Sequence, residues 1–177
     1  MDTCAVFLDR DGVLVETFVR DGRAYAATTL ADFRLVGNAA AEVGRLRDAG
    51  LAPIVVTNQP DVGRGVMALE TLAAMHERLA AALPVLDIFV CTHDSSAACA
   101  CRKPKPGMLE AAAVKWNIDL QRSFMVGDRA SDVEAGRAAG CRTILIDRPY
   151  SGTTTADAHV GSLGEAVDAI LTRWAGR

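Results

Sequence analysis

The sequence has few aromatic residues, no excess of positive charge and no long apolar runs. Aromatic residues make up only 5% of its 177 residues, so we expect no base-stacking surface for nucleic acids. Lysine and arginine total 19 against 22 aspartates and glutamates, and this net charge of −3 argues against a general nucleic-acid or membrane-surface binder. No apolar run approaches the roughly 18 residues of a membrane span. We therefore expect a protein that uses neither nucleic acids nor membranes as partners.

The first residues also lack the pattern of a secretory signal. They carry no basic region, and Asp9 ends the apolar stretch over residues 5–8. We therefore expect a cytoplasmic protein with reduced thiols. Its five cysteines are an odd number, and three of them crowd between positions 91 and 101. This clustering favours metal binding over disulfides.

The order of apolar segments predicts one α/β domain over residues 1–177. Hydrophobic residues make up 50% of the chain, enough for a sizeable core. Short runs that are apolar throughout predict strands buried on both faces, at 5–8, 53–56, 88–91, 124–126 and 143–146. Helices are expected between them, at 39–48 with Asn38 as N-cap, 69–83, 106–116, 130–139 and 163–174. This alternation predicts a doubly wound parallel sheet, with functional groups at the carboxyl ends of its strands.

Polar groups follow several of these strands. Asp9 and Asp11 lie after the first, at a turn opened by Gly12, and Thr57 ends the second. Asp128 follows the fourth strand, and a basic loop spans residues 101–107. A solvated turn or a helix cap explains each group taken alone. Their convergence on one sheet edge instead indicates a site.

The residue types at this edge suit phosphoryl transfer. Asp9, Asp11 and Asp128 would repel one another without a cation, and oxygen ligands are the preference of Mg²⁺. A carboxylate can attack phosphorus, and a second one can act as general acid and base. A hydroxyl and an ammonium can bind the shifting charge on the phosphoryl oxygens. The set contains the parts of a metal-assisted phosphomonoesterase.

The order of these motifs resembles the haloacid dehalogenase-like (HAD) phosphatases over nearly the whole chain. The resemblance rests on Asp9 with Asp11, then Thr57, Lys103 and the Gly127-Asp128-x-x-x-Asp132 segment. It implies that Asp9 is the nucleophile and Asp11 the general acid and base. Mg²⁺ would be held by Asp9, Asp128 and the backbone carbonyl of Asp11.

The same resemblance assigns the phosphate and substrate contacts. Thr57 and Lys103 would bind the transferring phosphoryl group. Lys105 competes for the lysine role, but the Arg102-Lys103-Pro104 triplet favours Lys103. Asp132 would support the metal loop. Further substrate contacts are expected from side chains next to these motifs, namely Asn58, Gln59, Arg102 and Arg129.

Four soft ligands surround the third predicted strand end. Cys91, His93, Cys99 and Cys101 supply three thiolates and one imidazole, a set typical of a tetrahedral structural Zn²⁺ site. The alternative is a group of free thiols beside a surface histidine. The other two cysteines, Cys4 and Cys141, are expected in the core. His76 and His159 are expected at the surface.

This cluster makes the chain similar to one HAD subgroup, which contains D-glycero-D-manno-heptose 1,7-bisphosphate 7-phosphatases and histidinol-phosphate phosphatases. By that resemblance zinc pins the loop that delivers Arg102 and Lys103, and no large cap domain is present. The loops 16–27 and 59–67 and the zinc loop at 91–101 would then cover the site. The chain departs from the pattern at 16–20, at Pro60 where serine is usual, and in a short zinc loop.

The leading hypothesis is a monomeric Mg²⁺-dependent phosphatase of a small phosphorylated metabolite, heptose 1,7-bisphosphate cleaved at the 7-phosphate. A histidinol-phosphate or other sugar-phosphate phosphatase is the alternative. A phospho-accepting receiver module is disfavoured, because receivers are phosphorylated after the third strand, where this chain has its cysteines. The sequence contains neither a G-x-S-x-G elbow nor a G-x-x-x-x-G-K-[ST] loop, which argues against a serine hydrolase and a P-loop nucleotidase.

Overall fold

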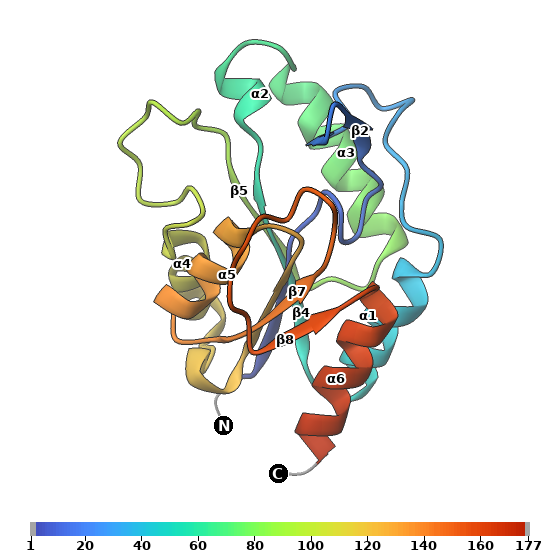
Figure 1. Cartoon of the computed structure of the whole chain (residues 1–177), viewed down its shortest axis with the longest axis vertical. Coiled ribbons are helices and arrows are strands. Elements are labelled where there is room, and N and C mark those ends of the chain that lie inside the picture. Colours follow the sequence, from blue (N-terminus) through green and yellow to red (C-terminus); the bar gives the residue numbers. More distant parts are fainter. Residues whose placement is uncertain (1–2, 176–177) are drawn as a thin grey trace.

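A parallel sheet forms the centre of the molecule in a computed structural model, which describes residues 3–175. The six strands follow the order β5-β4-β1-β6-β7-β8 (Figure 1). Their bounds are Ala5–Leu8 (β1), Ala52–Asn58 (β4), Asp87–Cys91 (β5), Phe124–Gly127 (β6), Arg142–Ile146 (β7) and Ala158–Val160 (β8). The predicted doubly wound α/β fold is confirmed.

Helices cover both faces of this sheet (Figure 1). One face packs on α1 (Ala39–Asp48), α3 (Leu69–Ala82) and α6 (Leu163–Ala175), and the other on α4 (Gly107–Trp116) and α5 (Ala130–Ala138). Successive strand side chains point to opposite faces, so Val6 and Leu8 join one core while Ala5 and Phe7 join the other. Both faces are buried, which explains the continuous apolar runs.

The chain changes direction beside β1, and this places the site. From β1 it adds β4 and then β5 on one side, and it returns to add β6, β7 and β8 on the other. Such a reversal opens a crevice at the carboxyl ends of the strands. Short segments at this end complete the crevice, namely α2 (Pro60–Gly63) and a hairpin of β2 (Phe18–Arg20) and β3 (Arg23–Tyr25).

All five predicted strands and all five predicted helices are present, with ends shifted by at most two residues. The hairpin, α2, β8 and the 3₁₀ turn Leu120–Arg122 were not predicted, because they are short and contain no buried residue. Asn38 is the N-cap of α1, but its side chain makes no capping bond and instead donates to Glu42 Oε1 at 3.5 Å. Among the described residues, no helix combines the length and apolarity that crossing a membrane requires.

Burial or exposure was predicted correctly for three of the four cysteines and histidines that lie outside the cysteine cluster. Cys4 and Cys141 are buried and His159 is exposed, as expected. The surface prediction for His76 was wrong, because its ring is half-buried on α3 with Nε2 3.3 Å from Arg10 Nη1. Burial, and then the Arg10 charge, lower the pKa of His76 to about 4. A neutral histidine suits a position beside a guanidinium.

Candidate active site

Three strand ends bring polar side chains together at and beneath one cavity. Asp9 follows β1 and lines the cavity. Thr57, the next-to-last residue of β4, and Asp128, which follows β6, are fully buried behind the lining residues Gln59 and Asp9. The cavity has a volume of about 480 Å³. Two of the three loops expected to cover the site contribute to its walls: 16–27 supplies Ala24, Tyr25 and Ala26, and 59–67 supplies Gln59, Pro60, Asp61 and Arg64. The zinc loop at 91–101 does not line the cavity; the segment directly after it does, through Arg102, Lys103 and Pro104.

Lys103 links the basic loop to these strand ends. Its ammonium donates to Asp9 Oδ1 at 2.8 Å and to Val56 O at 2.8 Å, and it pairs with Asp132 Oδ1 at 2.6 Å. Burial alone would lower the pKa of Lys103, but Asp132 and Asp9 outweigh it and raise that pKa. Lys105 is exposed and donates to Cys99 O, so Lys103 is the lysine that reaches the site.

Three buried carboxylates carry more negative charge than the protein balances. Single oxygens of Asp9, Asp128 and Asp132 lie within 4.8 Å of one another. Burial and then the neighbouring carboxylates raise the pKa of Asp128 to about 7, and burial raises that of Asp132 to about 6 although Lys103 opposes it. With all three ionised, the one buried cation among them, the Lys103 ammonium, leaves a formal charge of −2, because the Arg129 guanidinium 4.0 Å from Asp128 Oδ1 is exposed to solvent. A divalent cation with a preference for oxygen matches this remainder.

Asp128 supplies the clearest ligand for such a cation. It is fully buried, and within residues 3–175 its Oδ1 is the buried side-chain nitrogen or oxygen without a hydrogen-bond partner. A buried carboxylate oxygen in this state is costly unless a ligand satisfies it. The donor set therefore fits Mg²⁺.

Asp11 also lines the cavity, next to Asp9. Its carboxylate accepts from Arg10 Nε at 3.1–3.2 Å and from Gln59 Nε2 at 2.6 Å (Oδ2). Burial raises the pKa of Asp11, Arg10 opposes this shift, and Asp9 adds to it. A raised pKa favours a carboxyl group that can give and take a proton.

The amide side chains predicted to contact substrate are engaged with the site itself. Gln59 Nε2 also donates to Thr57 Oγ1 at 2.8 Å, so it orients both the hydroxyl and Asp11. Asn58 donates to Lys103 O at 3.0 Å and accepts from Lys103 N at 3.1 Å. Both residues line the cavity, and both hold other site residues in place.

Arginines surround the entrance to the cavity. Arg102 donates to His93 O at 3.1 Å, and Arg129 is exposed and donates to Ala24 O at 3.1 Å. Arg64, at the end of α2, lines the same cavity and was not predicted from the sequence. Three guanidinium groups around one opening favour an anionic ligand.

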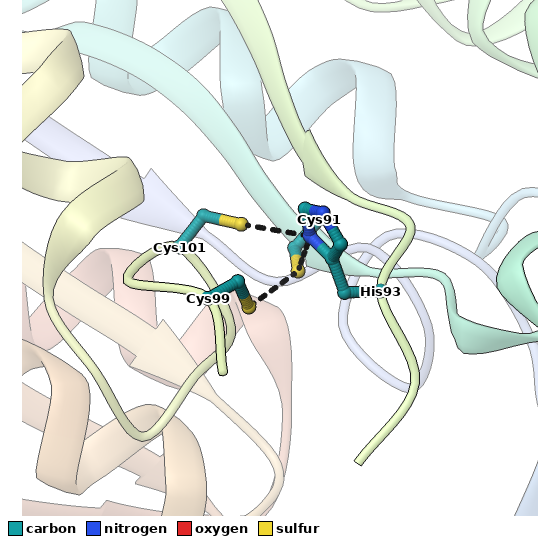
Figure 2. Close-up of side chains that lie close together, drawn as sticks. All are labelled: Cys91, His93, Cys99 and Cys101. Atoms are coloured by element: carbon teal, nitrogen blue, oxygen red, sulfur yellow. Dashed lines mark hydrogen bonds between the residues drawn. The ribbon is translucent and has the colours of Figure 1, made fainter. Parts of the chain in front are cut away.

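The four predicted zinc ligands converge at the carboxyl end of β5 (Figure 2). His93 Nδ1 lies 3.5 Å from Cys91 Sγ and 3.4 Å from Cys101 Sγ, and the Sγ atoms of Cys91 and Cys99 are 3.8 Å apart. Sulfurs on a tetrahedral zinc with bonds of about 2.3 Å stand about 3.8 Å apart. The donor set and its spacing fit zinc. Burial, and then Cys101, raise the pKa of Cys91 to about 12, so this thiol ionises only with a cation beside it.

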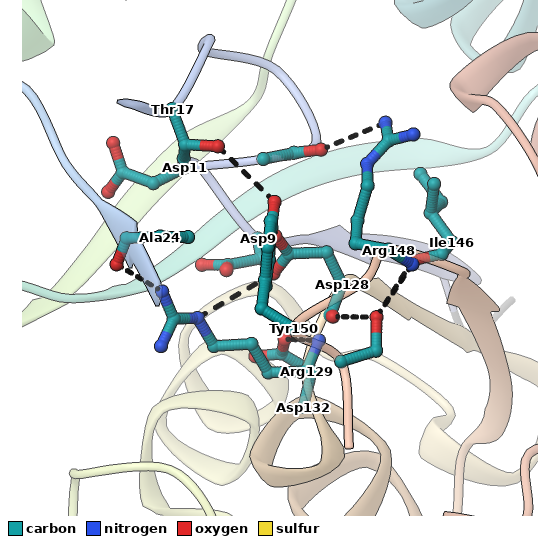
Figure 3. Close-up of polar contacts among 12 residues, drawn as sticks. Asp9, Asp11, Thr17, Ala24, Asp128, Arg129, Asp132, Ile146, Arg148 and Tyr150 are labelled. Carbon is teal, nitrogen blue, oxygen red and sulfur yellow. Dashed lines mark hydrogen bonds and ion pairs between the residues drawn. The ribbon is translucent and has the colours of Figure 1, made fainter. Parts of the chain in front are cut away.

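Besides Arg64, two contributors to the site were not predicted from the sequence, Arg10 and Tyr150. Arg10 is fully buried, stacks 5.4 Å from the Phe33 ring centre and pairs with Asp11 at 3.0 Å. The sequence feature that could have indicated its role is its position between two aspartates, just after an apolar run. Tyr150 donates to Asp128 Oδ2 at 2.8 Å (Figure 3). The sequence feature that could have indicated its role is its position four residues after the end of β7, near the carboxyl end of a strand.

Known proteins are similar to this chain in sequence. The family model for HAD-hydrolase-like proteins matches residues 100–171. A D-glycero-β-D-manno-heptose-1,7-bisphosphate 7-phosphatase of Pseudomonas putida is 38% identical over 80% of this chain and 81% of its own length. A D-glycero-D-manno-heptose-1,7-bisphosphate 7-phosphatase of Thermosynechococcus vestitus is 36% identical over 98% of both chains. The chain therefore belongs to the HAD-like phosphatases, in the family of these heptose bisphosphate phosphatases.

A solved structure agrees with this relationship. The D,D-heptose 1,7-bisphosphate phosphatase of B. bronchiseptica, complexed with magnesium and phosphate, superposes with a TM-score of 0.85. It is 27% identical, and the match covers 97% of this chain and 99% of that one. The fold of the two proteins is the same over nearly their whole lengths.

Proposed function

We propose that this protein is a Mg²⁺-dependent phosphatase that removes the 7-phosphate of D-glycero-D-manno-heptose 1,7-bisphosphate. The observation that carries the proposal is the buried group of Asp9, Asp128, Asp132 and Lys103, with Asp11 beside it at a cavity lined by arginines. The heptose bisphosphate phosphatases to which the chain is similar support the choice of substrate.

The first half-reaction begins at Asp9. Arg10 N and Lys103 Nζ both donate to Asp9 Oδ1 at 2.8 Å, so Oδ2 is the oxygen left to attack phosphorus. A bond forms between Oδ2 and phosphorus as the ester bond to the sugar oxygen breaks, and Asp11 gives that oxygen its proton. The products of this step are an aspartyl-phosphate on Asp9 and a heptose 1-phosphate with a free 7-hydroxyl.

The second half-reaction restores the enzyme. Asp11, now a carboxylate, takes a proton from water as the water oxygen attacks phosphorus, and Asp9 leaves as a carboxylate with release of inorganic phosphate. Thr57 Oγ1 and Lys103 Nζ bind the phosphoryl oxygens in both steps. When bound by Asp9, Asp128 and the Asp11 carbonyl, Mg²⁺ supplies positive charge opposite the carboxylates and the phosphoryl oxygens.

Specificity is assigned to the guanidinium groups at the entrance. A bisphosphate carries a second anion away from the reacting phosphorus, and Arg102 stands next to Lys103 on the same loop. A planar guanidinium can bind that anion through two hydrogen bonds. Arg129, which also lines the cavity, is the second candidate contact.

The cysteine cluster is assigned a structural Zn²⁺ ion. Its four protein donors fill a tetrahedral shell and leave no position for substrate. Cys101 is two residues before Lys103, so a zinc ion would fix the backbone that carries the lysine. All five cysteines are free, which suits a reducing compartment, and we assign the protein to the cytoplasm.

Phosphate release from a panel of substrates tests the function. The panel contains heptose 1,7-bisphosphate, histidinol phosphate, mononucleotides and an aryl phosphate, each with and without Mg²⁺. We expect Mg²⁺-dependent turnover with kcat/KM for the bisphosphate at least about tenfold above the others, since a charged hydrogen bond is worth roughly 1.5–3 kcal/mol. Phosphorus NMR of the product should show loss of the 7-phosphate. Preference for histidinol phosphate would overturn the substrate, and metal-independent turnover would overturn the mechanism.

A further inference from the structure

The two oxygens of the Asp128 carboxylate have different surroundings (Figure 3). Tyr150 donates its hydroxyl proton to Oδ2 at 2.8 Å. Oδ1 has no hydrogen-bond partner, and its nearest cation is Arg129, with Nε at 4.0 Å and a side chain that is 47% exposed. One oxygen is thus fixed by the protein, and the other is left for a ligand.

Several contacts hold Tyr150 in this position. Its hydroxyl lies 3.2 Å from Thr17 Oγ1, and the Arg129 guanidinium stacks 5.7 Å from its ring centre. The next residue, Ser151, donates from Oγ to the backbone carbonyl of Asp128 at 2.6 Å. The loop after β7 is therefore fastened to both the backbone and the side chain of Asp128.

The carboxylate has little freedom to turn away from this hydroxyl. Gly12 packs against it with φ +89°, and a Cβ at Gly12 would lie 1.9 Å from Asp128 Oδ2 and 3.1 Å from Tyr150 Oη. Only glycine allows the backbone to come this close. The carboxylate is confined between the Gly12 backbone and the Tyr150 hydroxyl.

The hydrogen-bond donor to Asp128 is a neutral hydroxyl, and this matters for metal binding. Lys103 pairs with Asp9 and Asp132 at 2.8 and 2.6 Å, so the fixed cation of the site is assigned to those two carboxylates. Asp128 receives a neutral O–H instead. A neutral donor satisfies Oδ2 without cancelling the negative charge that Oδ1 presents. A lysine or arginine in its place would compete with a metal ion.

We propose that Tyr150 is a positioning residue for the catalytic metal: its hydroxyl holds Asp128 Oδ2 so that Oδ1 alone faces Mg²⁺. The inference rests on the proposed function, in which Asp128 is a magnesium ligand. Partners of this kind orient metal ligands, and their loss typically weakens metal binding about 10- to 100-fold. Freed from Tyr150, both oxygens of Asp128 can face the cation, an arrangement that Ca²⁺ accepts more readily than Mg²⁺.

Calorimetric titration of the chelator-treated protein with Mg²⁺ and with Ca²⁺ tests the proposal. For Tyr150→Phe we expect the Kd for Mg²⁺ to rise at least about tenfold, with a smaller rise for Ca²⁺. Tyr25→Phe is the matched control, because it removes the hydroxyl of a tyrosine that lines the same cavity but makes no hydrogen bond to the Asp128 carboxylate. Its Kd for Mg²⁺ should stay within about twofold of wild type, and circular dichroism of each metal-free variant checks the fold.

The outcomes separate the two proposals. Wild-type protein that binds no Mg²⁺ would overturn the metal assignment and the proposed function with it. Equal Mg²⁺ affinity in wild type and Tyr150→Phe would overturn the role of Tyr150 alone. Equal weakening for Mg²⁺ and Ca²⁺ would assign Tyr150 a general structural role and also overturn the proposal. If Tyr150→Phe does not fold, the same titrations of Tyr150→Leu, which removes the hydroxyl without adding bulk or another donor, decide between these outcomes.

Discussion

The cluster of carboxylates at the strand ends and the cysteine cluster on the 91–101 loop lie at the same end of the sheet. They differ in the part of the structure that holds them in place. Asp9 and Asp128 follow central strands and are at most 7% exposed. Cys99 and Cys101 lie on a loop outside regular structure, and both are partly exposed. The sheet fixes the first group before any ion binds. By the proposal above, the second group depends on a zinc ion to hold its loop in place.

This difference separates what each metal does. At the strand ends, the packing holds like charges together, and a cation relieves their repulsion. On the loop, four donors from one short segment surround a point where an ion would cross-link them. Loss of Mg²⁺ should therefore remove activity and leave the fold intact. Loss of Zn²⁺ should loosen the loop, reduce stability and reduce activity through Lys103.

The largest effect is expected at the nucleophile. Asp9→Asn keeps the shape of the side chain but removes the attacking charge, so kcat should fall at least about 10³-fold. Its melting temperature should stay near that of wild type, since the strand holds residue 9 in place. Asp147→Asn is the control, because Asp147 follows β7 but pairs with His159 outside the cavity. Turnover by fresh Asp9→Asn protein at a rate comparable to wild type would refute the covalent mechanism.

A second substitution at the strand ends separates proton transfer from metal binding. Asp11→Asn keeps the backbone carbonyl assigned to the metal, so its Mg²⁺ affinity should change little. Sugar phosphates, which have poor leaving groups, should lose about 10²- to 10⁴-fold in rate, and aryl phosphates should lose less. Steady-state rates on both substrates measure the difference. Equal losses on the two substrates would remove the general-acid role of Asp11.

The loop side of the comparison is tested by Cys99→Ser. Elemental analysis of wild type purified without added metal should find about one zinc per chain, and this variant should lose it. We expect a lower melting temperature, by at least about 4 °C, together with reduced activity. Cys141→Ala, which changes a core thiol outside the cluster, should keep its zinc. A zinc-free wild type with full activity and unchanged melting would contradict the structural role.

Arg102 joins the two regions, because it follows the last cysteine and lines the cavity. Arg102→Ala should weaken the transition state for a bisphosphate by about 1.5–3 kcal/mol, the range for a hydrogen bond to a charged group. An aryl monophosphate has no second anion, so its kcat/KM should change little. If both substrates lose equally, Arg102 serves the reacting phosphate, and the bisphosphate assignment loses its structural support.

The smallest effect concerns His76, which packs on the arginine behind Asp11. In the unfolded chain its pKa is near 6.5, and in the folded protein it is about 4. Between these values the unfolded chain binds a proton that the folded protein does not. The contribution of neutral His76 is therefore present above about pH 6.5 and is lost as the pH falls towards 4. His76→Gln should lose less stability than wild type between pH 7 and 4.5 in urea titrations; an identical loss would contradict the assignment.

The sequence alone was sufficient for the parts of this molecule that follow from pattern. Runs such as 5–8 and 144–146 are apolar throughout because both faces of their strands are buried, so the strands were predictable. Parallel strands end at one edge, so Asp9, Thr57 and Asp128 were predicted to meet. The cysteine spacing made the second cluster predictable in the same way.

The parts that were missed depend on contacts between distant segments. Strand β8 has three residues and alternates exposed with half-buried positions, so no apolar run marks it. The local sequence does not mark His76 as a buried residue, because its contact with Arg10 comes from 66 positions away in the sequence. Tyr150 reaches Asp128 only because β6 and β7 are neighbours in the sheet. These contacts form only in the tertiary fold, so the local sequence pattern does not predict them.

Identification of the phosphorylated residue during turnover tests the central claim most directly. The enzyme is quenched in acid while it hydrolyses heptose 1,7-bisphosphate, the acyl phosphate is reduced with borohydride, and peptide mass spectrometry locates the modified side chain. We predict modification at Asp9, which requires Mg²⁺ and is absent from Asp9→Asn. Modification at another residue, or turnover at the wild-type rate with Asp9 unmodified throughout, would contradict the assignment of the strand-end carboxylates as the catalytic site.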